Sequence, residues 1–146
     1  MLSLSHKFLL KAILVLSLIG IADTSYLTSD FYFGTGVNCS LLQGCEVVLT
    51  SPYSAVFGIP LSLLGLIFYI TVFILVSAIG AYQKNIFTRL LAVAGTIGFC
   101  VSLFLLYVQI FLLKEVCIYC LTSTVSSTTI FVFSMTVLSR SKVYLG

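Results

Sequence analysis

The sequence predicts an all-α membrane protein in which four transmembrane helices form a bundle, and three observations support this fold class. Hydrophobic residues make up 60% of the chain and charged residues only 8%, whereas soluble domains carry about 25% charged residues. The apolar residues gather in four runs long enough to cross a bilayer. The alternating pattern of a membrane barrel is absent. We therefore expect residues 1–146 to form a single integral membrane domain.

The four apolar runs predict helices at about residues 8–27, 56–82, 90–113 and 117–138. An extracytoplasmic loop of residues 28–55 is expected to join the first helix to the second.

The first run is the weakest of the four. Lys7 and Lys11 before a short apolar stretch resemble a signal peptide, and Asp23 lies near the end of the run. No small-x-small cleavage site follows, however, and apolar residues resume at Tyr26 and Leu27. We favour a retained helix.

The basic residues predict the orientation, because Lys and Arg concentrate on the cytoplasmic side of a membrane. They precede the first helix, separate the second from the third and follow the fourth: Lys7, Lys11, Lys84, Arg89, Arg140 and Lys142. The loop of residues 28–55 has neither Lys nor Arg. We expect a multi-pass protein of the plasma (inner) membrane with both termini in the cytoplasm. The net charge of +3 lies between apolar runs and forms no patch for nucleic acid.

This orientation places four of the five cysteines in the oxidising compartment, where disulfides persist. Cys117 and Cys120 open the fourth helix, and residues three apart on a helix share a face. Unpaired backbone N–H groups and the helix dipole favour thiolate there. Cys100, in the middle of the third helix, is expected to be a small buried apolar residue.

The outer loop supplies a second pair, Cys39 and Cys45, in a glycine-rich and therefore pliable segment. A movable pair beside a fixed pair suits a relay of electrons, because each thiol–disulfide exchange passes through a mixed disulfide. Two structural disulfides, or a zinc site made of four thiolates, are the alternatives.

Electrons that reach the fixed pair need an acceptor. The chain shows no Gly-rich phosphate loop for a nucleotide and no histidine pair for haem. No metal is expected. The acceptor that fits an apolar bundle is a membrane quinone, of the ubiquinone or menaquinone/phylloquinone type, bound in an apolar pocket with few polar groups.

Four features together resemble the vitamin K epoxide reductase family in its bacterial form. They are the pair Cys39 and Cys45, Ser51 six residues after Cys45, the stretch GIPLSLLGLIFY at residues 58–69, and the pair Cys117 and Cys120. The resemblance covers nearly the whole chain.

The resemblance implies a thiol oxidoreductase that supports disulfide formation in exported proteins. A thioredoxin-like partner would attack the Cys39–Cys45 disulfide at Cys39, and the freed Cys45 would attack Cys117. Cys120 would then be the thiolate beside the quinone. Bacterial members often carry a fused thioredoxin-like domain, but this chain stops soon after Arg140, so the partner is expected to be a separate protein.

The family also suggests supporting residues. Ser51 would lie near the quinone on a half-helix formed by residues 46–57, with Pro52 fixing its geometry; a turn or capping serine is the alternative. By the same alignment, Leu64 and Phe68 become candidates for the quinone wall, with ordinary helix packing as the alternative.

This chain departs from the animal enzymes at two positions. Leu61 stands where they have an Asn, and Thr124 where they have a Tyr. Both animal residues recognise the quinone head, so we expect quinone reduction here, with vitamin K epoxide reduction as an alternative. The other bacterial disulfide generator has its two cysteine pairs in the opposite order. A non-enzymatic protein with structural disulfides is the remaining alternative.

Overall fold

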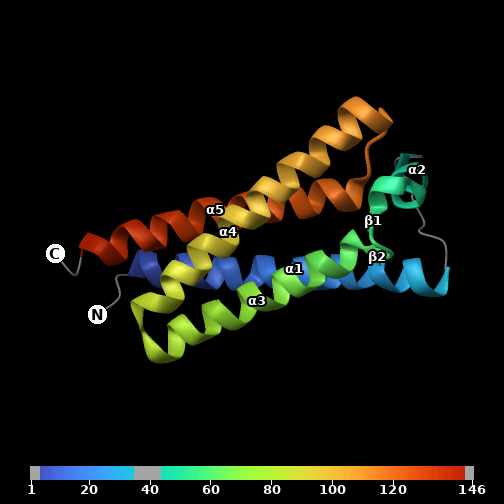
Figure 1. The fold of residues 1–146 in the computed structure, drawn as a ribbon. Coiled ribbons are helices and arrows are strands. Elements are labelled where there is room, and N and C mark those ends of the chain that lie inside the picture. Colours follow the sequence, from blue (N-terminus) through green and yellow to red (C-terminus); the bar gives the residue numbers. More distant parts are fainter. Residues whose placement is uncertain (1–3, 35–43, 144–146) are drawn as a thin grey trace.

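The computed structural model describes residues 4–34 and 44–143, and four long helices dominate it (Figure 1). They are α1 (Leu4–Phe33), α3 (Leu61–Tyr82), α4 (Asn85–Tyr107) with its π-helical continuation η2 (Val108–Leu113), and α5 (Ile118–Val143). In the part of the chain described, four helical segments, α4 and η2 counting as one, are long and apolar enough to cross a membrane. The predicted fold class is confirmed.

The second long helix begins later than predicted. The apolar run starts at Val56, but α3 begins at Leu61. Pro60 precedes it in an extended conformation, and a proline disfavours helix at the residue before it. The strands β1 (Ala55–Val56) and β2 (Ile59–Pro60) pair antiparallel instead. Phe57 and Gly58 between them both have positive φ, as a tight hairpin turn requires.

The half-helix predicted at residues 46–57 is only partly correct. A short helix, α2 (Gly44–Thr50), does form, but it ends before Ser51. Ser51 is extended because Pro52 follows it, and Pro52 then starts a single 3₁₀ turn, η1 (Pro52–Ser54). The remainder of the predicted half-helix is strand β1 and its turn.

The four long helices pack as a ring of neighbours. The most extensive contacts join α1 to α3 and α4 to α5, and further contacts join α1 to α5 and α3 to α4. The apolar core includes Ile13, Tyr69, Leu91 and Ile130, one from each helix. Both chain ends and the α3–α4 turn lie at one end of the bundle, and α2 with the β1–β2 hairpin lies at the other (Figure 1). We refer to the latter as the α2 end.

Small residues bring α4 and α5 close together, as is common in membrane bundles. A Cβ atom on Gly95 would lie 2.7 Å from Ser134 Oγ and 3.3 Å from the Phe131 Cα atom. Because one of these contacts is to backbone, a side chain at Gly95 requires the helices to separate.

The Gly95→Val substitution is therefore expected to destabilise the bundle by about 1–3 kcal/mol, the usual cost of overpacking. Thermal unfolding of the purified protein in detergent would show this as a lower midpoint. Gly80→Val is the matched control, because a Cβ on Gly80 of α3 meets nothing within 4 Å. Equal midpoints for the two variants would contradict the packing described here.

Candidate functional site

A cavity of about 890 Å³ opens among the helices and reaches residues of α2, η1 and η2. Its wall combines residues of α1, α2, η1, α3, α4, η2 and α5. Most of the wall surface is apolar, but 14 of the 31 lining residues in the described part of the chain carry a hydroxyl, amide or carboxyl group. Sites for small organic ligands have this character and fall between roughly 300 and 1,000 Å³.

Cys120 lies on the wall of this cavity and is half-buried. It belongs to the first turn of α5, where backbone N–H groups lack partners within the helix. One turn further along, Thr124 donates a hydrogen bond from its hydroxyl to the Cys120 carbonyl oxygen at 2.8 Å. The positive end of the helix dipole thus lies beside a sulfur that borders the cavity.

Cys117 immediately precedes α5 and is fully buried. Its N–H donates to Gln109 Oε1 at 3.3 Å, and its carbonyl oxygen accepts from the Leu121 N–H at 3.0 Å. Its side chain belongs to a small apolar cluster with Val48 of α2. Cys117 is absent from the cavity wall, so the two cysteines of this pair have different surroundings.

The helix α2 packs against Val116 and Cys117, which directly precede α5. A Cβ atom on Gly44 would lie 3.0 Å from both the backbone N and the backbone O of Val116. Glycine therefore permits the backbones to approach. Gly44 and Val48, which lie on either side of residue 45 in α2, both contact this segment. Cys39 and the side chain of Cys45 lie outside the described part of the structure.

Ser51, Leu64 and Phe68, which the sequence suggested as supporting residues, all line the cavity. The Ser51 hydroxyl donates to the Val48 carbonyl oxygen at 2.8 Å, so Ser51 also closes the turn after α2. The Phe68 ring occupies the space that a Cβ on Gly98 would need, which joins α3 to α4. A role of these three residues in quinone binding stays a prediction.

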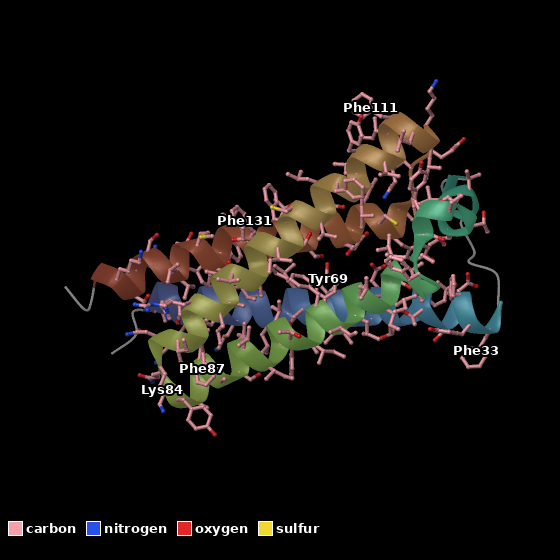
Figure 2. The ribbon with its side chains drawn as sticks, in the orientation of Figure 1. Phe33, Tyr69, Lys84, Phe87, Phe111 and Phe131 are labelled. Atoms are coloured by element: carbon pink, nitrogen blue, oxygen red, sulfur yellow. The ribbon has the colours of Figure 1, made fainter. Side chains whose placement is uncertain are left out.

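Sequence reasoning missed a polar pair in the middle of the bundle. The Tyr69 hydroxyl donates to the Ser123 carbonyl oxygen at 2.9 Å and lies 2.9 Å from Ser123 Oγ. Both residues line the cavity, and Figure 2 shows Tyr69 in the interior of the bundle. A tyrosine and a serine inside apolar runs were the available signal, but their pairing across 54 positions follows only from the fold.

The expectation for Cys100 is wrong. Its side chain is exposed on α4 rather than buried in the bundle. Gly95 and Gly98 occupy the inward face of this part of α4. Cys100, two residues beyond Gly98, points away from the other helices, towards the surroundings that a membrane would fill.

Comparison with known proteins adds one finding. A model of the vitamin K epoxide reductase family matches residues 11–135, which is most of the chain. This range covers the core of all four long helices and both cysteine pairs. No curated protein sequence matches the chain.

Proposed function

The chain belongs to the vitamin K epoxide reductase family, and from this premise we propose that it passes electrons from a separate thioredoxin-like protein to a membrane quinone. As a member, it is a membrane redox enzyme. In the proposed reaction two cysteine pairs carry the electrons, Cys39 with Cys45 and then Cys117 with Cys120. The disulfides it generates in its partner would be passed on to exported proteins.

The observation that carries the proposal is the different placement of Cys117 and Cys120. Cys120 borders a cavity of the size and apolar character that a quinone requires. Cys117 is buried against Val48 of α2, the helix that contains Cys45. A disulfide between Cys117 and Cys120 would thus present one sulfur to the loop pair and the other to the quinone. This is the arrangement that a relay through mixed disulfides needs.

The cysteine pairs are proposed to face the extracytoplasmic side. The start of α5 lies at the α2 end of the bundle, which is opposite both termini and the α3–α4 turn (Figure 1). Lys84 in that turn and Arg140 near the C-terminus lie at the opposite end. The concentration of basic residues at cytoplasmic ends supports this orientation.

A quinone is proposed as the oxidant rather than vitamin K epoxide. Leu61 and Thr124, the two positions at which animal enzymes carry Asn and Tyr, both line the cavity. An apolar leucine cannot donate a hydrogen bond there, and the Thr124 hydroxyl is directed to the Cys120 carbonyl oxygen. The wall therefore lacks the two polar groups with which the animal enzymes recognise their substrate.

The proposal is tested by turnover of the purified protein in lipid vesicles. Supplied with a reduced thioredoxin-like protein and a short-chain ubiquinone, it is expected to form one quinol for each dithiol oxidised. Quinone absorbance and thiol titration measure the two products separately. Oxidation of the thiol protein without matching quinol, or no reaction with either ubiquinone or menaquinone analogues, would contradict the proposal.

A further inference from the structure

The carboxyl group of Asp23 has no role in the electron relay proposed above. Asp23 lies on α1 and lines the same cavity as Cys120. Its Oδ2 atom is buried and has no hydrogen-bond partner among the residues described. An ionisable side chain within a membrane helix is costly, and where it faces a cavity it commonly marks a proton path or a polar ligand.

The neighbours of Asp23 place it near the reacting end of the site. The Tyr69 ring packs against Gly20, which precedes Asp23 by about one turn of α1. The Tyr69 hydroxyl is in turn bonded to Ser123, which follows Cys120 by one turn of α5. Thus Asp23 of α1 and Cys120 of α5 line the same cavity, each about one helical turn from a residue that contacts Tyr69.

We propose that Asp23 donates a proton to the quinone as it is reduced, an inference that rests on the function proposed above. Oxidation of the Cys117 and Cys120 thiols to a disulfide releases two electrons and two protons. Reduction of the quinone to quinol consumes two of each. The electrons pass from sulfur to the quinone ring, one proton passes from the Asp23 carboxyl group to a quinone oxygen, and the second comes from water.

Asp23 must recover its proton after each turnover. Asp30 lines the same cavity seven residues further along α1, about 10 Å nearer to the α2 end. The two thiol protons are released to water at this end. Water at this end can return one proton to Asp23, so the sum of the steps is dithiol plus quinone giving disulfide plus quinol.

The proposal is tested in a single turnover, with the pre-reduced protein in detergent mixed with a short-chain ubiquinone and followed by quinone absorbance. Asp23→Asn is expected to slow quinol formation by about 100-fold or more, the contribution typical of a general acid. Asp23→Glu, which keeps a carboxyl group, is expected to recover most of the rate. Glu115→Gln makes the same change outside the cavity wall and is expected to stay within about twofold of the wild type.

A second variant distinguishes a catalytic role of Asp23 from a structural one. Asp23→Ala is expected to be equally slow and to regain rate when formate, a small carboxylic acid, is added, whereas chloride at the same ionic strength has no effect. The rate at which dithiothreitol reduces the oxidised protein needs no quinone and is expected to be unchanged in all the Asp23 variants.

Three results would overturn the proposal. One is an Asp23→Asn protein that forms quinol as fast as the wild type. Another is an equal slowing of the dithiothreitol step, which would indicate a structural role. The last is a wild-type protein that reduces no quinone, in which case the proposed function fails as well. If Asp23→Asn is fast while Cys120→Ala is inactive, only the role of Asp23 is wrong.

Discussion

Replacing Cys120 by alanine is expected to abolish quinone reduction. Cys120 is the sulfur of its pair that borders the cavity, whereas Cys117 is fully buried and directed towards α2. Without Cys120, no thiolate lies beside the quinone and the pair cannot close its disulfide. Removing a covalent nucleophile typically lowers turnover by on the order of 10³-fold or more. The rate of quinol formation with a reduced thioredoxin-like donor measures this loss.

Cys100→Ala is the matched control for this experiment. It makes the same chemical change on a thiol that is exposed on α4 and absent from the cavity wall. Its turnover is expected to stay within about twofold of the wild type, as for a surface substitution away from the site. A Cys120→Ala protein that melts at the wild-type temperature yet retains a tenth of the activity would exclude Cys120 as the group that reduces the quinone.

The four membrane helices could be predicted from sequence because their existence depends on the transfer of apolar side chains from water to lipid. Their ends depend on backbone geometry, which a hydropathy pattern does not report. The run that starts at Val56 is apolar throughout, yet Pro60 delays the start of α3 to Leu61. Pro52 similarly divides the expected half-helix after Thr50. In both places the proline restricts the backbone of the residue before it, whatever the hydropathy of its neighbours.

The candidate site was predictable where a motif marked it. Cys120, Ser51, Leu64 and Phe68 were all named from the sequence, and all line one cavity. Their places in binding or catalysis stay predictions.

The other polar groups of the site had no motif. Tyr69 and Ser123 meet only because α3 and α5 pack in one bundle, and the same packing brings Asp23 of α1 to the same cavity. The exposure of Cys100, which was expected to be buried, also follows from how the helices pack. The face of α4 that turns inward is the one that carries Gly95 and Gly98, since close packing in membranes selects small residues rather than apolar ones.

In the proposed relay, transfer of the disulfide from the loop pair to the pair at the start of α5 would pass through a bond between Cys45 and Cys117. The segment Gly44–Val48 contacts the chain around Val116 and Cys117, which supports this exchange. A Cys120→Ser variant cannot form the Cys117–Cys120 disulfide, so the mixed disulfide forms when the Cys117 thiolate attacks Cys45 of the Cys39–Cys45 disulfide and releases the Cys39 thiol. No second thiol beside Cys117 can then displace Cys45. The mixed disulfide is therefore expected to accumulate as the major form of the protein.

Peptide mass spectrometry under non-reducing conditions tests this claim most directly. The Cys117→Ser variant is the control, and it is expected to show no link between the loop and α5. The Cys120→Ser protein is predicted to yield peptides joined through Cys45 and Cys117. Recovery of only the Cys39–Cys45 link, with Cys117 as a thiol, would contradict the relay.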